Sequence, residues 1–216
     1  MSLLEHPVHL IIVLFALSLL PLFAVMGTSF LKISIVLSML RTALGVQQIP
    51  PNMAIYGLSM VLTLFIMAPV GSEIYSNLKQ NPIKLSAPDI LERLNTQAAE
   101  PYREFLKKHS HAKQINYFSK VGHKIWPKAY HENLDKNSLM VLIPAFTLSQ
   151  LIEAFKIGLL LYLPFVAIDI IVSNILLAMG MMMVSPMTIA LPFKILIFIM
   201  MGGWEKLISQ LMLSYS

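Results

Sequence analysis

The chain has 216 residues, of which 56% are apolar and 12% are charged, and its formal net charge is +5. An ordinary soluble domain has about a quarter charged residues, so this composition excludes that class and predicts a membrane-associated protein. Cysteine is absent, which excludes disulfides, thiolate metal sites and a cysteine nucleophile, and is compatible with an oxidising compartment.

The first predicted element is an uncharged segment over residues 8–31. As a helix rising about 1.5 Å per residue, it is long enough to cross a bilayer core of about 30 Å. Pro21 is expected to bend this helix and Gly27 to loosen it. The residues before it lack the Lys or Arg of a signal peptide, and no small-residue cleavage site follows, so we expect the helix to be retained.

A second apolar run contains Lys32 and continues to Arg41. A charge inside such a run must reach water or find a partner, so both residues are predicted to make contacts between helices or between subunits. Pro50 and Pro51 end this run, and residues 52–70 form another apolar segment of roughly spanning length. Residues 1–70 are therefore expected to form an N-terminal apolar helical hairpin.

Residues 71–137 form a polar insert, since they carry 11 of the 16 Lys and Arg and 7 of the 11 Asp and Glu. Ser86 can cap a helix with Pro88 and Asp89 in its first turn, and Pro101 can open another. Two apolar stripes at helical spacing predict the core of a small soluble helical domain. The stripes are Tyr102, Phe105 and Leu106, and then Ile115, Phe118, Val121 and Ile125.

The insert also contains most of the histidines, which raises the question of a metal site. The spacing of these histidines places no strong pair on one helical face. We therefore predict no metal site and no cofactor. The histidines are His109, His111, His123 and His131.

The C-terminal part, residues 138–216, is apolar but is interrupted by charges. Only twelve residues separate Lys156 from Asp169, too few to span a bilayer alone. Charges in lipid cost on the order of several kcal/mol, so these segments are expected to be covered by protein. Glu153 and Lys156 are spaced to pair on one helix, whereas Asp169 and Lys194 need partners from another helix or subunit.

Prolines are predicted to break the helices of this C-terminal part, because proline lacks the backbone N–H and its ring clashes with the preceding turn. The predicted breaks are Pro144, Pro164, Pro186 and Pro192.

A methionine run, with five methionines in the nine residues 179–187, precedes and spans Pro186. Methionine side chains are flexible and polarizable, so a ring of them can close on itself and still reshape around a passing chain. The alternative is that these methionines fill gaps between apolar helices. The residue types alone leave both interpretations open.

Three blocks of sequence carry a family resemblance. They are Lys32 with residues 41–52 (RTALGVQQIPPN), residues 144–158 (PAFTLSQLIEAFKIG), and residues 164–186, from PFVAID to GMMMVSP. In this order they resemble the SctR/FliP family, the export-apparatus membrane proteins of type III secretion systems and bacterial flagella. The match covers nearly the whole chain outside the insert.

The resemblance implies a noncatalytic subunit of an export gate in the bacterial inner membrane, where unfolded secreted proteins leave the cytoplasm. It implies a pentameric homo-oligomer with SctS-, SctT-, SctU- and SctV-like partners, and no role in nucleic-acid binding. Met181, Met182 and Met183 match the family's pore gasket. The expected fold is all-α, with membrane-derived helical hairpins, proline-broken helices and a small helical soluble insert.

Two details of the resemblance concern branch and sidedness. Gln150, Gly202 and the form of residues 47–52 are more similar to the injectisome branch, associated with virulence, than to the flagellar branch. The family places the insert in the periplasm, although its net charge of +4 (11 minus 7) would favour the cytoplasm. Loops longer than about 60 residues largely escape the positive-inside rule, so we follow the family.

Two other functions would use residues that the sequence also contains. A soft-metal transporter would use the methionines as thioether ligands for Cu(I), but supporting Cys or His residues are missing from the run. A membrane hydrolase would use Ser149 or Ser185 as nucleophile, but the C-terminal part contains no His to activate either hydroxyl. A protein-export subunit is therefore the preferred prediction.

Overall fold

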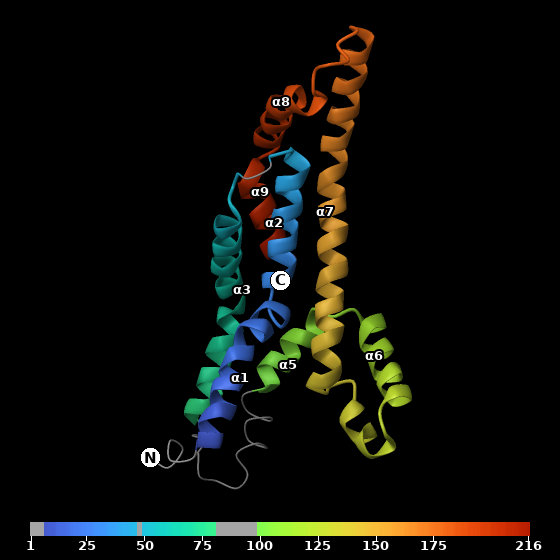
Figure 1. The fold of residues 1–216 in the computed structure, drawn as a ribbon. Coiled ribbons are helices and arrows are strands. Elements are labelled where there is room, and N and C mark those ends of the chain that lie inside the picture. The colour runs from blue at the N-terminus through green and yellow to red at the C-terminus, as the bar shows by residue number, and fades with distance from the viewer. Residues whose placement is uncertain (1–6, 47–48, 81–98) are drawn as a thin grey trace.

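The computed structural model describes residues 7–46, 49–80 and 99–216 (Figure 1). Across these ranges the chain is helical and contains no strand, which confirms the all-α prediction. The helix expected after Ser86 and the motif residues Gln47 and Gln48 lie outside the described residues. The elements are α1 (Pro7–Met26), α2 (Phe30–Leu44), α3 (Asn52–Gln80), α5 (Ala99–Lys108), α6 (Ala112–Ile125), the 3-10 helix η3 (Lys128–Leu134), α7 (Leu139–Ala178), α8 (Pro186–Met200) and α9 (Gly203–Leu213).

The uncharged N-terminal segment is not one straight helix. The last turns of α1 and the whole of α2 meet at an angle of 63°, and the bend lies at Gly27, since α1 continues through Pro21. The Tyr102 hydroxyl from α5 donates to the Gly27 carbonyl at 2.9 Å. A Cβ at Gly27 would lie 2.1 Å from that hydroxyl oxygen, so only glycine permits this approach.

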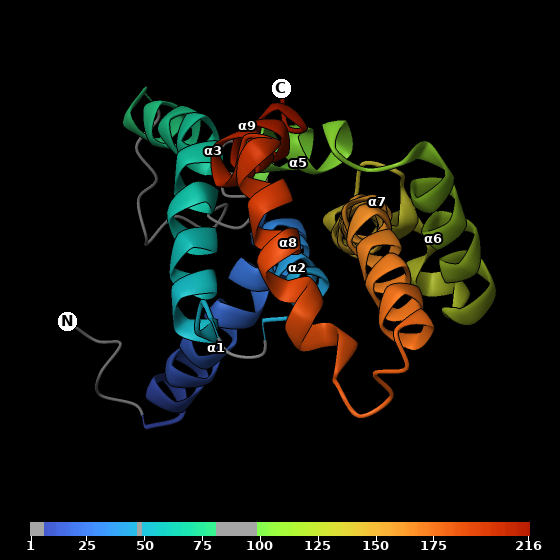
Figure 2. The ribbon, with the colours of Figure 1, turned by 90° about the horizontal axis from the view of Figure 1, so that it is seen from above.

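Helix α2 forms the centre of the larger core, between α3 on one side and α7 on the other (Figure 2). Its apolar residues at helical spacing, including Ile33, Leu37 and Leu40, are fully buried. Gly158 on α7 lies opposite Met39, whose sulfur would be 2.2 Å from a Cβ at that glycine. The close approach of α2 and α7 therefore depends on the missing side chain.

Three of the four predicted helix breaks do not occur. Helix α7 continues for 40 residues through Pro144 and Pro164, and α8 continues through Pro192. The prediction was wrong because the φ angle of proline is compatible with a helix, so the chain can lose one hydrogen bond and continue when neighbouring helices support it. Pro186 does lie at a break, as the first residue of α8.

The insert packs as a small second core against the first turns of α7. Phe105, Leu106 and Ile115 are buried there, together with Leu134 from η3 and Phe146 from α7. The predicted stripe is wrong at one position. Ile125 is 71% exposed, because α6 ends there and the chain turns away at Trp126.

Two helices, α3 and α7, are long and apolar enough to cross a membrane, and up to four spans result if each bent helix pair counts as one. Helix α3 continues to Gln80, past the hairpin boundary expected at residue 70. Only 11% of the apolar window in α7 is buried within the chain. Most of its surface is therefore available to lipid or to other proteins.

Candidate functional site

The methionine run forms the loop between α7 and α8, at the far end of the molecule from the insert (Figure 1). Gly180, with φ of 74°, ends α7. The N–H of Met181 donates to the Leu176 carbonyl at 2.9 Å, and the N–H of Gly180 donates to the Leu177 carbonyl at 3.0 Å. This pair of bonds is the Schellman motif, which requires the left-handed glycine.

The methionine side chains extend from this loop into open space. Met182 is 81% exposed and Met183 is fully exposed, while Met181 is 42% exposed. These three side chains therefore do not fill gaps within the single chain. The arrangement presents flexible apolar groups to whatever lies beyond the tip of α7.

A charged pair joins the two helices that flank this loop. Lys194 on α8 is 2% exposed, and its Nζ lies 2.6 Å from Oδ2 of Asp169 on α7. The same ammonium donates to the Ala43 carbonyl at the end of α2 at 3.1 Å. The pair therefore ties α7, α8 and α2 together, and each charge finds its partner on another helix of the same chain.

One acceptor of this pair is unused. Oδ1 of Asp169 is buried and has no hydrogen-bond partner among the described residues. A buried carboxylate oxygen without a donor is costly, and because the chain itself already covers this atom, a neighbouring protein cannot contact it directly.

Lys32 lies at the opposite end of α2, where it contacts the C-terminal segment. It is 3% exposed, and its Nζ lies 3.7 Å from the ring centroid of Tyr215. The Tyr215 hydroxyl donates to Oε1 of Gln150 at 2.6 Å. No pattern in the sequence indicated a role for Tyr215, because its position beside Lys32 depends on how α9 folds back along α2.

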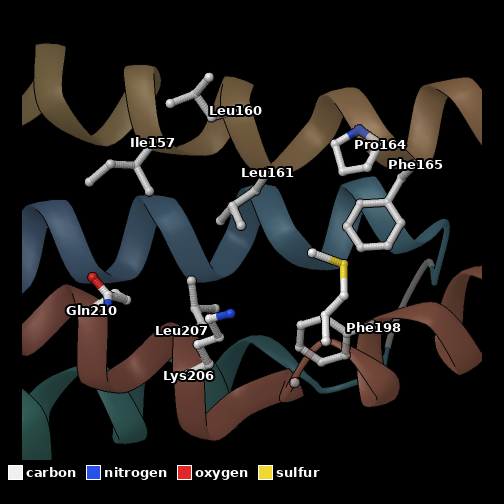
Figure 3. A pocket seen from close by; sticks show the side chains of 11 residues that line it. Ile157, Leu160, Leu161, Pro164, Phe165, Phe198, Lys206, Leu207 and Gln210 are labelled. Atoms are coloured by element: carbon white, nitrogen blue, oxygen red, sulfur yellow. The ribbon is translucent and has the colours of Figure 1, made fainter.

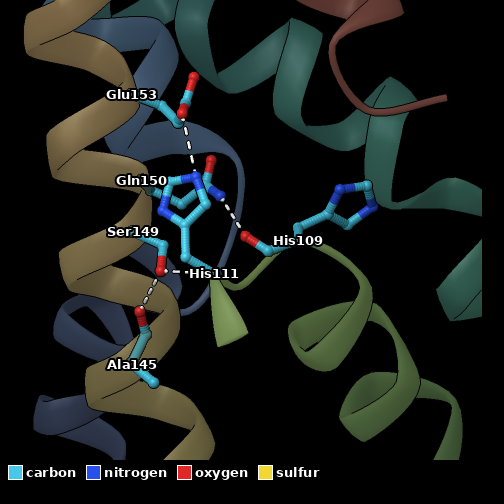
Figure 4. A network of polar contacts seen from close by, with 6 residues as sticks. All are labelled: His109, His111, Ala145, Ser149, Gln150 and Glu153. Atoms are coloured by element: carbon cyan, nitrogen blue, oxygen red, sulfur yellow. Dashed lines mark hydrogen bonds and ion pairs between the residues drawn. The ribbon is translucent and has the colours of Figure 1, made fainter. Parts of the chain in front are cut away.

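A polar junction connects the insert to α7 (Figure 4). Gln150 Nε2 donates to the His109 carbonyl at 2.8 Å, and the His111 N–H donates to the Ser149 hydroxyl at 3.0 Å. His111 Nε2 lies 3.0 Å from Oε1 of Glu153. These five residues, through their side chains or backbone, thus join the α5–α6 turn to one face of α7.

The pairing expected between Glu153 and Lys156 is not formed. Glu153 contacts His111 across helices, and Lys156 is exposed on α7 without an ion pair to a described residue. Spacing on one helix permitted the local pair, but the insert places a competing partner beside Glu153 that the sequence order does not indicate.

His109 lies between the insert and the C-terminal segment, with its ring 4.7 Å from that of Phe105 and 5.1 Å from that of Tyr215. Burial, and then the charges of Lys108 and Lys32, lower the pKa of His109 from 6.5 to about 4. The imidazole is therefore neutral at neutral pH.

Arg41 holds the turn between α2 and α3. Its Nη1 donates to Oδ1 of Asn52 at 2.5 Å and to the Pro50 carbonyl at 3.3 Å. The charge thus lies at the end of the hairpin, where it supplies a donor to backbone that proline leaves without regular helix bonds.

An apolar pocket of about 280 Å³ lies between α7 and the α8–α9 bend (Figure 3). Leu161, Phe165, Phe198 and Leu207 line it, and Lys206 and Gln210 lie at its edge. The lining offers no nucleophile and no cluster of titratable groups. This pocket is suited to an apolar side chain or lipid tail rather than to a reaction.

The described part of the chain contains no candidate metal centre, since no group of three or more His, Cys, Asp or Glu side chains converges there. His123 and His131 do lie together, with ring centroids 4.9 Å apart. Each ring already contacts a backbone carbonyl, of Ser119 and Trp126 respectively.

Comparison with known proteins gives one consistent result. The sequence profile of the FliP family matches residues 13–211. The chain is 54% identical to virulence protein YscR of Salmonella typhimurium over the full length of both chains, and 52% identical to Yop proteins translocation protein R of Yersinia pestis over 98% of each. It is 44% identical to harpin secretion protein HrcR of Erwinia amylovora, over 97% of this chain and 96% of that protein.

Proposed function

Because the chain belongs to the FliP family and is of the injectisome SctR type, we propose that it is a core subunit of a type III secretion export gate. Its relatives are named for virulence, translocation and secretion, which supports a role in a secretion apparatus. In this role the subunit assembles with further copies of itself and with SctS-, SctT-, SctU- and SctV-like proteins. Unfolded substrate proteins pass through the pore that they form.

The exposed methionine loop is the observation that best supports a role in the pore. Met181, Met182 and Met183 extend from the tip of the two longest C-terminal helices, and no described residue covers Met183. In a ring of subunits such loops would converge as a deformable apolar seal that limits leakage and yields to a passing chain.

The location that we propose is supported by the apolar helices and by the position of the insert. Helices α3 and α7 have the length and composition to cross the inner membrane, and the insert lies at the end of α3 and the start of α7. We place this insert on the periplasmic side. A cysteine introduced at exposed Tyr130 would then react with a membrane-impermeant maleimide in whole cells, without a background thiol in the chain.

Replacing Met181, Met182 and Met183 together with alanine tests the seal. The loop backbone bonds and Pro186 remain, so we expect the complex to assemble with normal yield while ions or small dyes leak through it. The matched control is Met200→Ala with Met201→Ala, since both methionines are exposed outside the loop. An intact complex that stays as tight as the unmodified protein would remove the sealing role from these residues.

The same variant separates the seal from soft-metal transport. A Cu(I) transporter would lose copper uptake or tolerance without a solute leak, because thioether ligands would be lost while the barrier remained. If the methionines instead filled gaps between assembled subunits, the complex would lose stability by roughly 2–5 kcal/mol per buried Met→Ala change and would dissociate.

A further inference from the structure

One face of α6 carries a row of three lysines and one tyrosine. Lys113, Tyr117, Lys120 and Lys124 recur at helical spacing, all four are exposed, and α6 contains no acidic residue. The row lies opposite the buried Ile115 side of the helix. We call these four residues the lysine row. None of its lysines forms a hydrogen bond or ion pair with any other described residue.

A groove with acidic edges lies between α3 and α5. It encloses about 440 Å³, with exposed Glu73 from α3 and exposed Glu104 from α5 among its lining residues, and with Val70 and Phe105 among the apolar ones. Lys108 and His109 line the same groove. Two carboxylates therefore line the groove together with one ammonium and one imidazole, and neither carboxylate forms an ion pair with a described residue.

The lysine row and the acidic groove are separate surfaces of the molecule. The groove lies between α3 and α5, and α5 continues through the turn at residues 109–111 into α6, which lies on the other side of α7 from α3 (Figure 2). The lysine row is on the side of α6 opposite to the buried Ile115. A contact between the two surfaces would join different patches of successive copies, which is the heterologous arrangement that closes into a ring when the rotation permits.

We propose that the lysine row of one copy packs into the acidic groove between α3 and α5 of the next copy. This inference rests on the homo-oligomer of the proposed function and specifies one of its interfaces. Tyr117 lies between Lys113 and Lys120 on the helix face, and apolar residues line the groove together with Glu73 and Glu104. In the proposed contact the aromatic ring meets the apolar lining while the ammonium groups meet the carboxylates. Complementary charges of this kind fix register and exclude wrong partners more than they add affinity.

Photo-crosslinking tests the contact in the full chain, expressed in membranes and solubilised in mild detergent. Tyr117→p-benzoylphenylalanine keeps an aromatic ring in the lysine row. We expect a ladder of covalent oligomers beyond the dimer, with crosslinks that map by mass spectrometry to residues 66–73 or 101–108. The matched control is Tyr130→p-benzoylphenylalanine, which is similarly exposed but lies outside the row. Its crosslinks should not map to the groove.

Charge reversal gives a second, independent measurement. Lys113→Glu with Lys120→Glu, or Glu73→Lys with Glu104→Lys, should lower the ladder yield by about tenfold, because like charges then face each other across the contact. Combining all four substitutions should restore the yield to within about twofold. Yield that stays low in the combination would overturn the pairing.

The outcomes also separate this inference from the proposed function. If native mass spectrometry finds an oligomer but Tyr117 crosslinks map to lipid, to another protein or outside the groove, the interface is wrong and assembly stands. If the chain is monomeric both alone and with its export-apparatus partners, the assembly and the interface both fail.

Discussion

At the scale of single residues, the buried ammonium of Lys194 shows how a charge is tolerated in this apolar chain. Its two contacts, the Asp169 carboxylate and the Ala43 carbonyl, come from two other helices. A buried cation needs such partners because its desolvation is costly. Glu153 lies in a more exposed environment, since its contact with His111 is partly open to water.

Asp169→Asn should therefore reduce the stability of the folded protein more than Glu153→Gln does. The first substitution leaves a buried ammonium without its counter-charge, and we expect a loss of about 3 kcal/mol in stability together with weaker assembly. The second removes a half-exposed pair and should cost about 1 kcal/mol or less. Thermal unfolding and blue-native gels of both variants measure this difference. Equal effects would mean that Asp169 is not the residue that stabilises Lys194.

Gly27 offers a second residue-scale prediction. Gly27→Ala should destabilise the bend between α1 and α2, since the new methyl group would displace the Tyr102 hydroxyl and break its bond to the Gly27 carbonyl. Tyr102→Phe removes the clashing oxygen, and the nearest ring carbon would then lie 3.4 Å away. The double variant should thus be more stable than Gly27→Ala alone. Additive losses in a double-mutant cycle would contradict this account.

At the scale of elements, the junction between the insert and α7 combines the His111–Glu153 contact with hydrogen bonds between neutral polar groups. His109, Gln150 and Tyr215 lie where α5, α7 and the end of α9 meet. Because burial disfavours the charged form of His109, the insert is docked by a neutral imidazole and by amide hydrogen bonds.

This arrangement predicts that the junction weakens in acid. The pKa of His109 is about 4 in the folded chain and 6.5 in the unfolded chain, so the unfolded state binds more protons between these values. The contribution of His109 to stability is complete above about pH 6.5 and is lost as the pH falls towards 4. His109→Gln should flatten this part of the pH profile. Melting of wild type and variant at pH 7.5 and 4.5 measures it, and identical slopes would refute the role of His109.

At the scale of the whole molecule, the chain leaves much of its apolar surface uncovered. The membrane-spanning window of α7 is mostly exposed, and two apolar pockets line its contact with α8 and α9. Large exposed apolar patches are typical of surfaces that contact lipid or other proteins.

We therefore expect the purified protein to be a homo-oligomer or a complex with its export-apparatus partners. Isolated chains would leave the exposed apolar faces, above all that of α7, without protein contacts. Native mass spectrometry in mild detergent gives the copy number directly. A stable, homogeneous monomer would contradict the assembly that we propose.

The sequence by itself determined the helical class, the polar insert and the family. These follow from local patterns: uncharged runs of spanning length, the charge concentrated in residues 71–137, and three motif blocks. It also predicted the helix break at Pro186, where α8 begins, because proline acts through backbone geometry over a few residues.

Only the tertiary structure decided which charges meet and which prolines are tolerated. Lys194 finds Asp169, and Glu153 finds His111 rather than Lys156, because these contacts depend on how distant helices pack. Helix α7 passes through Pro144 and Pro164 since packing against α2 and the insert supports it. Periodicity and spacing describe one helix at a time, and a partner supplied by another helix has no signature in them.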